Sequence, residues 1–467
     1  MRMITFGRAA VLAAALSVAA RGADAQQPAR EQPPPLGTPK SFTVPPKREF
    51  TLANGMRVTL VPFGTVPKAS VYCIVRTGHI DEGSNEVALA DITGEMMREG
   101  TTELTATQVA QRVAGMGGEL VVNVGDDRTQ IGGAVLSEHG PDMVRLVAQV
   151  LRTPRFPESE LARITSTKAR EVAIAKSQPQ SIAQEQFVKT VYGDHPYGRL
   201  FPTPEMLQGY TIAQVRAFHA RNFNATRAHL YVAGVFNAAP MERAIREAFD
   251  GWAAGPAPTD NVPVPRPHPG LSLLDRPAAP QSTIMLGLPV PDPTAKDYTA
   301  LEVTDALLGG TFGSRITTNI REQKGYTYSP YSYLGTHRHS AYWVQQADVT
   351  TKFTGASLKE IFGEIARLQK ETPPPAEVDG IKNNMIGIFV LRNASRGGII
   401  NLLAESELQG FGDDYLSGYV KRVLAVPPAE IQRMAATYLT PDRMTLVVVG
   451  DKATVAEQVA PYQRPVP

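Results

Sequence analysis

One pattern of helix, aromatic residue, short turn, strand and glycine occurs twice in this chain. The first copy reads "VRAFHARNF" and continues into "RAHLYVAGVF", and the second reads "IQRMAATYLTPDRMTLVVVGD". Phe223 and Tyr438 hold the same place in the two copies, 215 residues apart, and Gly234 and Gly450 are 216 residues apart. A repeat of this length predicts two halves built on one plan.

The segments around the repeat indicate the fold class. A linker rich in proline and glycine, residues 253–270, separates the copies. Alternating apolar and polar residues around Asn54-Gly55 predict a β-hairpin, "SVYCIVRTG" predicts a further strand, and helical patterns follow through about Lys189. We therefore expect an α+β fold of two duplicated halves, residues 48–252 and 271–462, each a mainly antiparallel sheet packed against helices.

The beginning of the chain is typical of an exported protein. Residues 1–25 combine Arg2 and Arg8 with the apolar run "AAVLAAALSVAA" and a cleavage-type "ADA" ending at Ala25. A signal peptide cleaved after Ala25 would direct the mature chain to the periplasm or outside the cell, and a retained membrane anchor is the alternative. Residues 26–47, rich in proline and polar residues, are expected to be a disordered lead-in.

Composition argues against several classes of partner. The formal net charge is +2 and no basic cluster stands out, so we expect no binding to nucleic acid. No later segment approaches 18 uninterrupted apolar residues, so we expect no membrane insertion of the mature chain. The single cysteine, Cys73, cannot form an internal disulfide and is expected to be a buried core thiol.

The chain lacks the side chains of a zinc hydrolase. Two zinc-binding histidines on one helix are typically four residues apart, and no two of the eight histidines have this spacing. Neither HExxH nor its inverse HxxEH is present, and one cysteine excludes a thiolate site. His337 and His339 could share one side of a strand, but no third ligand is evident. A GxSxG elbow and a phosphate-binding loop are also absent.

Several motifs in the right order nevertheless resemble one family. "RTGHIDEGSNEVALADITGEMMREGT" resembles the zinc-helix region of the pitrilysin and insulinase-like metallopeptidases, in particular small bacterial two-domain members related to mitochondrial processing peptidase subunits. "GDHPYGR" and "LLGGTFGSRITTNIREQKGYTYSPYS" are similar to two further family motifs. The resemblance covers nearly all of the mature chain and implies the same duplicated fold.

The resemblance also implies that the zinc site is degenerate. The family's first zinc histidine falls on Asp91, its catalytic glutamate on Gly94 and its second zinc histidine on Glu95. The third ligand, a glutamate, falls on Glu171. Carboxylates alone bind zinc poorly, and Gly94 offers no side chain to deprotonate water. We therefore expect no metal and no catalytic residue on this helix.

Two other interpretations of the helix remain open. Asp91, Glu95 and Glu171 could hold a hard cation such as calcium, although a calcium site would want six or more oxygens. The same three residues could also form an unusual metallopeptidase site. Alternatively, the acidic residues form a solvated stripe that includes Glu99. A buried seam on the same helix would then consist of Leu89, Ile92 and Met96.

The second half keeps a pair of residues that the family uses. In catalytic members, an arginine and a tyrosine seven residues apart bind the substrate and support the transition state, and "REQKGYTY" places Arg321 and Tyr328 at this spacing. A guanidinium and a phenol are suitable donors to a developing oxyanion. Tyr326 competes for the tyrosine role at a spacing of five, and the family spacing favours Tyr328.

These features predict a non-catalytic subunit. We expect a periplasmic heterodimer in which a homologous partner with HxxEH holds the zinc, while this chain binds extended peptide and donates Arg321 and Tyr328. On its own the chain would be no enzyme and would need no cofactor. The alternatives are a structural protein that uses the fold for assembly and a peptide-binding or chaperone module without an enzymatic partner.

Overall fold

The computed structural model describes residue 37 and residues 39–463. The predicted export signal, residues 1–25, lies outside these residues. By its contacts the chain divides into residues 1–40 and residues 41–467, and all helices and strands of the described residues lie in the second unit. Among the described helices, none combines the length and the apolar character that crossing a bilayer requires.

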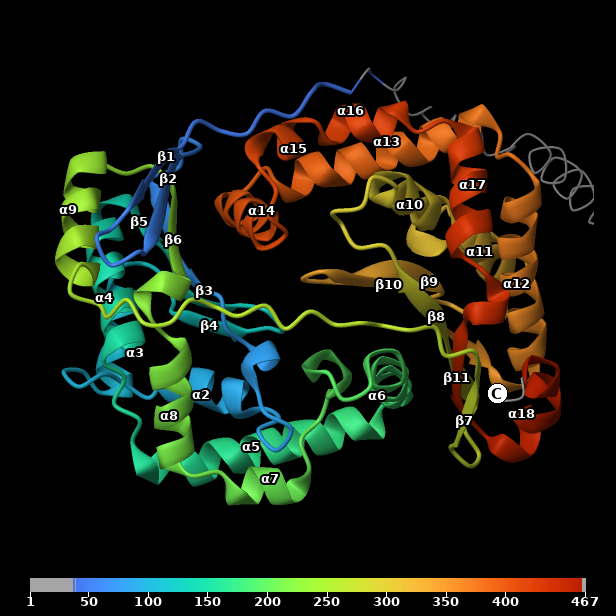
Figure 1. Cartoon of the computed structure of the whole chain (residues 1–467), viewed down its shortest axis with the longest axis horizontal. Coiled ribbons are helices and arrows are strands. Elements are labelled where there is room, and N and C mark those ends of the chain that lie inside the picture. Colours follow the sequence, from blue (N-terminus) through green and yellow to red (C-terminus); the bar gives the residue numbers. More distant parts are fainter. Residues whose placement is uncertain (1–36, 38, 464–467) are drawn as a thin grey trace, which may run out of the picture. The chain divides into compact units, whose positions relative to one another are not determined.

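The first half is built on a six-stranded mixed sheet with the order β1-β2-β6-β3-β5-β4 (Figure 1). Strands β2 and β6 run parallel, and the other neighbours are antiparallel. The hairpin at Asn54-Gly55 is confirmed, with Gly55 at φ +87° in the turn between β1 and β2. The strands are β1 (Arg48–Thr51), β2 (Arg57–Pro62), β3 (Lys68–Val75), β4 (Val121–Val124), β5 (Thr129–Leu136) and β6 (Ala228–Gly234).

Strands β4 and β5 correct one prediction. The helical pattern expected through about Lys189 is wrong here, because both strands lie inside it. Strand β4 has only four residues, and β5 contains Gly132 and Gly133, so neither shows a clear alternation of apolar and polar residues. The close approach of β3 explains one of these glycines, because a Cβ atom on Gly132 would lie 2.0 Å from the carbonyl oxygen of Val71.

Helices cover one face of this sheet and form the first core with it. Helices α2, α4, α8 and α9 contribute buried apolar residues that meet alternate residues of β2, β3, β5 and β6. Cys73 lies in this core and is buried, as expected. The helices of the first half are α2 (Leu89–Met97), α3 (Ala106–Gly115), α4 (Gly140–Arg152), α5 (Glu158–Ser177), α6 (Pro179–Tyr192), α7 (Pro204–Gly209), α8 (Ile212–Asn222) and α9 (Ala238–Phe249).

The second half repeats the plan of the first. Its five-stranded sheet has the order β7-β11-β8-β10-β9, again with one parallel pair, β7 and β11. Omitting β1, the two sheets match strand for strand, so the duplication expected from the repeat is confirmed. Strands β4 and β9 are the equivalent edge strands. The strands are β7 (Gly270–Asp275), β8 (Gln281–Val290), β9 (Tyr331–His337), β10 (Ser340–Thr350) and β11 (Thr445–Gly450).

The helices of the second half pack on its sheet in the same way. Helices α10, α12 and α17 supply much of the second core. Two π-helical segments, η5 (Ala306–Gly310) and η6 (Thr318–Gln323), interrupt this region. The α-helices are α10 (Tyr298–Asp305), α11 (Arg315–Thr317), α12 (Thr354–Lys370), α13 (Pro375–Arg392), α14 (Arg396–Leu408), α15 (Asp413–Ser417), α16 (Tyr419–Ala425), α17 (Pro428–Tyr438) and α18 (Lys452–Val459).

One helix of each half packs on the sheet of the other half. Helix α6 of the first half packs on the remaining face of the second sheet, where Phe187 meets β8 and β11. Helix α14 of the second half packs in return on β3 and β6, where Ile400 and Leu403 lie beside Tyr231. A Cβ atom on Gly287 of β8 would lie 2.8 Å from the ring of Phe187, so a glycine permits this contact. Both sheets therefore have two covered faces.

The described part of the expected lead-in is anchored. Residues 39–47 contain no helix or strand, but the Phe42 ring packs edge-on against Phe389 of α13 at 5.0 Å between centroids. Lys47 forms ion pairs with Glu49 and Asp413 at 2.9 Å each.

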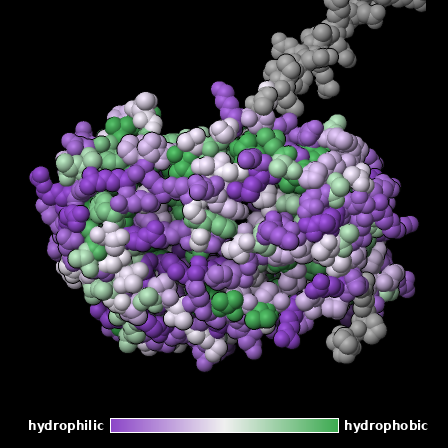
Figure 2. Space-filling model, turned by 45° about the horizontal axis from the view of Figure 1, so that its top comes forward, coloured by the Kyte–Doolittle hydropathy of each residue, from purple (hydrophilic) through white to green (hydrophobic). Residues whose placement is uncertain are grey.

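The molecular surface is mixed in polarity. On the face drawn in Figure 2, hydrophobic residues form small groups between hydrophilic ones.

Candidate functional site

Helix α2 is held firmly at the place where the family's zinc helix was expected. Leu89, Ile92 and Met96 are buried, which confirms the predicted seam. At the N-terminus of the helix, the Glu82 carboxylate accepts a hydrogen bond from the Ala90 amide at 2.8 Å. Burial raises the pKa of Glu82 to about 7. The buried seam and the hydrogen bond to Ala90 together fix the helix, so the side chains on its opposite face have a defined direction.

The four positions matched to the zinc site lie together. Asp91, Gly94 and Glu95 of α2 and Glu171 of α5 all line one cavity of about 320 Å³. The resemblance placed Glu171 here from a residue 80 positions away, and the structure brings it to the same cavity. The remaining lining residues come from α2 and its C-cap, from α5 and from edge strand β4: Ile92, Arg98, Val122, Val124, Arg163, Ile164, Thr167 and Lys168.

Two basic side chains, one of them lining this cavity, flank Asp91. The Lys168 ammonium lies 2.6 Å from Oδ2 of Asp91 and 3.6 Å from Oε2 of Glu171. On the other side, Nε2 of His79 lies 3.1 Å from Oδ1 of Asp91. Both oxygens of the carboxylate therefore have a partner from the chain itself.

The pKa values agree with this charge arrangement. Burial alone would lower the pKa of Lys168, but the charge and hydrogen bond of Asp91 raise it. Burial also opposes protonation of His79, whereas hydrogen bonds to Asp126 and Asp91 raise its pKa to about 10. Burial would raise the pKa of Asp91, and the two cations lower it instead. At neutral pH a negative carboxylate therefore lies between two positive groups.

Gly94 leaves no room for the side chain that the family has at this place. A Cβ atom on Gly94 would lie 2.6 Å from Cγ2 of Val124 and 3.4 Å from Cγ1 of Val122. Edge strand β4 thus packs directly on the helix. The glycine, which disfavours a helix interior, is explained by this close approach.

The residues present do not fit a zinc ion or a hard dication. Within residues 39–463, no three histidine, cysteine, aspartate or glutamate side chains are grouped so that they could hold a metal. Asp91 is paired twice, and Glu95 lies beside Arg98 at 3.3 Å and faces solvent. No imidazole comes from α2 itself. This donor set offers neither the soft ligands that zinc prefers nor the oxygens that calcium needs.

The ion-pair network continues into the second half. Nδ1 of His79 lies 3.0 Å from Asp126, which follows β4, and the other oxygen of Asp126 lies 3.2 Å from Nδ1 of His337. The His337 ring stacks on Tyr197 with 4.0 Å between centroids. His337 therefore contributes to contact between the two halves. Sequence reasoning missed Lys168, His79 and Asp126; the spacing of three between Lys168 and Glu171 on one helix was the available signal.

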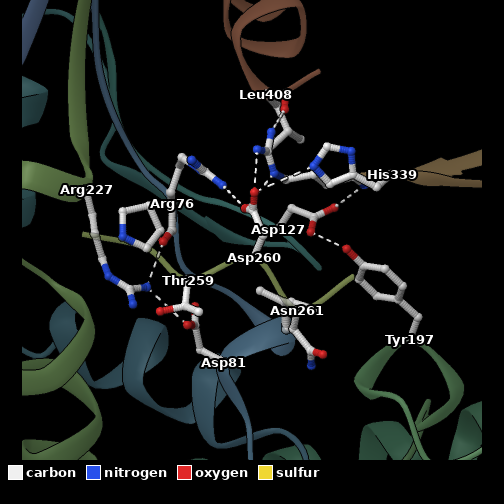
Figure 3. Close-up of a pocket in the computed structure, with 13 residues that line it drawn as sticks. Arg76, Asp81, Asp127, Tyr197, Arg227, Thr259, Asp260, Asn261, His339 and Leu408 are labelled. Carbon is white, nitrogen blue, oxygen red and sulfur yellow. Dashed lines mark hydrogen bonds and ion pairs between the residues drawn. The ribbon is translucent and has the colours of Figure 1, made fainter. Parts of the chain in front are cut away.

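A second cluster ties the linker to both halves (Figure 3). Asp260 of the linker accepts two hydrogen bonds from Arg338 at 2.8 Å each and one from Arg76 at 2.9 Å. The Tyr197 hydroxyl donates to Asp127 at 2.5 Å beside them. These residues surround a cavity of about 20 Å³, the size of one water molecule. His339 lies 3.6 Å from Asp260, so the motif "THRHS" serves ion pairs in this region.

Arg321 and Tyr328 lie together on the surface of the second half. The Arg321 Cζ atom lies 4.8 Å from the centroid of the Tyr328 ring and 4.4 Å from that of Phe312. Tyr328 is 77% exposed and Phe312 is 70% exposed. Cation–π interactions with these two rings hold the guanidinium, and its Nε also lies 3.1 Å from Oε1 of Glu322, so its terminal nitrogens are the atoms that could donate hydrogen bonds to a substrate.

The alternative tyrosine has a different environment. Tyr326 stacks on Phe353 with 4.5 Å between centroids and packs against the second core. Arg321 itself lies in η6, and Phe312 lies in the turn between η5 and α11. π-Helical turns are rare and frequently occur at functional sites. Phe312 was not predicted, and only its place in "GGTFGSR" could have indicated it.

The duplicated α+β fold, with an altered ligand helix in the first half and an arginine beside an exposed tyrosine in the second, defines a peptidase-like chain. Residues 58–205 match the family model described as insulinase (peptidase family M16), and residues 209–385 match the model described as the peptidase M16 inactive domain. The chain belongs to the M16 peptidase family.

Its relatives include proteins called zinc proteases. An uncharacterized zinc protease of Mycobacterium bovis is 27% identical over 364 residues, which cover 77% of this chain and 81% of the relative. A protein of the same description from Bacillus subtilis is 23% identical over 403 residues, which cover 85% of this chain and 96% of the relative.

Solved structures share the fold. The peptidase M16 inactive domain from Pseudomonas fluorescens matches with a TM-score of 0.81 at 23% identity, and covers 90% of this chain and 100% of its own. A protease from Helicobacter pylori matches with a TM-score of 0.81 at 20% identity, over 87% of this chain and 100% of its own. At these identities the likeness supports the architecture alone.

Proposed function

We propose that this chain is the non-catalytic subunit of a heterodimeric zinc peptidase of the periplasm. A homologous partner carrying HxxEH would hold the zinc ion and the catalytic base. This chain would bind extended peptide and donate Arg321 and Tyr328 to the partner's active site. The periplasmic location rests on the predicted signal, residues 1–25.

The contrast between the two halves supports this division of labour. In the first half, Lys168 and His79 neutralise Asp91, and Val124 closes the place of the base. In the second half, Arg321 contacts the rings of Phe312 and Tyr328 while Tyr328 stays 77% exposed. Packing gives no reason for a phenol to be held in this way. The contact between the partly buried Arg321 and the exposed Tyr328 is the single observation that carries the proposal.

The chemistry required of the pair is modest. When bound, zinc on the partner would polarise the peptide carbonyl and supply the attacking water. The guanidinium of Arg321 and the hydroxyl of Tyr328 would donate hydrogen bonds to the peptide and to the developing oxyanion. Edge strands β4 and β9 offer backbone groups to which an extended peptide could pair.

Reconstitution tests the proposal. This chain is co-expressed with a homologue that contains HxxEH, and peptide hydrolysis is measured for each chain alone and for the mixture. We expect co-purification, no hydrolysis by this chain alone, and turnover by the mixture. Zinc-dependent hydrolysis by this chain alone would contradict the proposal. Peptide binding without any effect on the homologue would instead support a binding module.

A further inference from the structure

We infer that the Lys168 ammonium is a built-in cation that occupies the metal position of the first half and excludes a metal ion from it. The inference goes beyond the proposed function, because it concerns only this chain's own cavity and holds with or without a partner. The inference starts from a contrast: the family includes zinc peptidases, but the residues of this chain's cavity do not fit a zinc ion.

The position of the ammonium is the first argument. Nζ of Lys168 lies 2.6 Å from Asp91 and 3.6 Å from Glu171, between the first and the third of the matched ligand positions. Lys168 precedes Glu171 by one turn of α5, so its stem and the glutamate extend from the same face. A tethered cation here links α2 to α5 as a shared metal ion would.

The partners of Asp91 are the second argument. His79 lies 3.1 Å from Oδ1 and Lys168 lies 2.6 Å from Oδ2, so a metal ion could bind Asp91 only by displacing one of them. Asp91 is 23% exposed and Lys168 is 25% exposed, so neither side chain can turn freely to solvent. A dication next to the ammonium would also be repelled by it, most strongly in a partly buried cavity.

The inference explains how the cavity persists without its metal. Carboxylates at three matched positions without a cation would place unpaired negative charges close together. Lys168 and His79 neutralise Asp91, and Arg98 lies beside Glu95 at 3.3 Å. Each charge has an internal partner, so the first half keeps its arrangement independently of metal.

Two histidines inserted into the full-length chain test the inference. D91H/E95H places two imidazoles four residues apart on α2 and leaves Gly94 and Glu171 unchanged. We expect this variant to retain no more zinc after dialysis than the wild-type chain. The additional change K168A should raise zinc retention to one equivalent per chain and add zinc-dependent thermal stabilisation. D91H/E95H/K168R, which keeps the cation, should behave like the double variant.

Each alternative result decides against the inference. One equivalent of zinc in D91H/E95H would show that Lys168 does not exclude metal. No zinc in D91H/E95H/K168A would show that something else does. If the histidines prevent folding, single substitutions replace them: K168A should lower the Tm by roughly 2–4 °C whereas K168R should not. Equal melting temperatures for these two variants would overturn the inference.

Discussion

The guanidinium carbon of Arg321 lies 4.8 Å from the ring centroid of Tyr328 and 4.4 Å from the ring centroid of Phe312. Both rings are exposed, so neither is part of a core. The second half therefore presents an arginine whose orientation is set in advance, next to a phenol. Pre-orientation of this kind lowers the entropy that a donor loses when it binds a substrate.

Phe312 should affect turnover through its cation–π contact with Arg321. Replacing Phe312 with alanine removes one cation–π contact, worth about 0.5–1 kcal/mol at an exposed site. We expect F312A to lower the kcat of the reconstituted pair by roughly 2–5-fold, because each 1.4 kcal/mol is a factor of ten. F312W should keep the rate. Equal rates for F312A, F312L and wild type would contradict a role for the ring.

A side chain at position 94 should destabilise the protein, because Val124 occupies the space that it would need. Alanine favours a helix interior by about 1 kcal/mol over glycine, but its Cβ atom would lie 2.6 Å from Val124 Cγ2. Overpacking typically costs about 1–3 kcal/mol, so G94A should lower the free energy of unfolding in urea.

The background variant V124A provides the control for this substitution. With the valine methyl groups removed, G94A should become stabilising, since only the helix preference remains. The double-mutant cycle measures this coupling directly. Additive effects in the cycle would show that the two residues do not clash.

His79 should make the protein less stable at high pH. Its pKa in the folded chain is raised to about 10, against about 6.5 in an unfolded chain. A group with a raised pKa contributes its full stabilisation below the unfolded value and loses it as the pH rises toward the folded value. We expect the free energy of unfolding to fall between pH 6.5 and 9.5 in wild type, on the order of 2 kcal/mol after allowance for solvent screening.

Substitutions separate His79 from other titrating groups. H79Q should flatten this decline at high pH. His219 provides the control: burial lowers its pKa to about 4, so its stabilisation is present above about pH 6.5 and is lost as the pH falls. H219Q should therefore leave the decline at high pH unchanged. An unchanged slope in H79Q would contradict the assigned charge.

The linker should loosen when Asp260 is removed. Its carboxylate accepts hydrogen bonds from Arg76 of the first half and Arg338 of the second, and charge-assisted bonds of this kind are each worth roughly 1–2 kcal/mol when partly exposed. We expect D260A to speed proteolytic cleavage beside Val262 and Val264, which are exposed. D142A, which removes a surface partner of Arg145, should not.

The fold could be predicted from sequence to the extent that it is repeated. Phe223 holds the same place in the first copy of the pattern as Tyr438 holds in the second. The duplicated plan therefore followed from spacing alone. Strands β4 and β5 were missed because a four-residue strand and a strand with Gly132 and Gly133 carry little periodic signal. The exchange of α6 and α14 between halves was not predictable, since an apolar helix face does not specify which sheet it will cover.

The site could be predicted only where motifs are contiguous. Asp91, Gly94 and Glu95 lie on one turn of helix, and resemblance placed Glu171 beside them. Lys168 carries no such mark, because a lysine on a helix is usually solvated. The link from His79 through Asp126 to His337 joins residues far apart in sequence. Side-chain pairs of this kind become visible only when the chain is folded.

Turnover by the reconstituted pair tests the central claim most directly. Arg321→Ala and Tyr328→Phe on this chain should each lower kcat, the arginine change by on the order of 10²-fold, as for the loss of one oxyanion donor. The matched neighbours Lys324→Ala and Tyr331→Phe should leave kcat unchanged. Full turnover by the pair with Arg321→Ala and Tyr328→Phe combined would contradict the account.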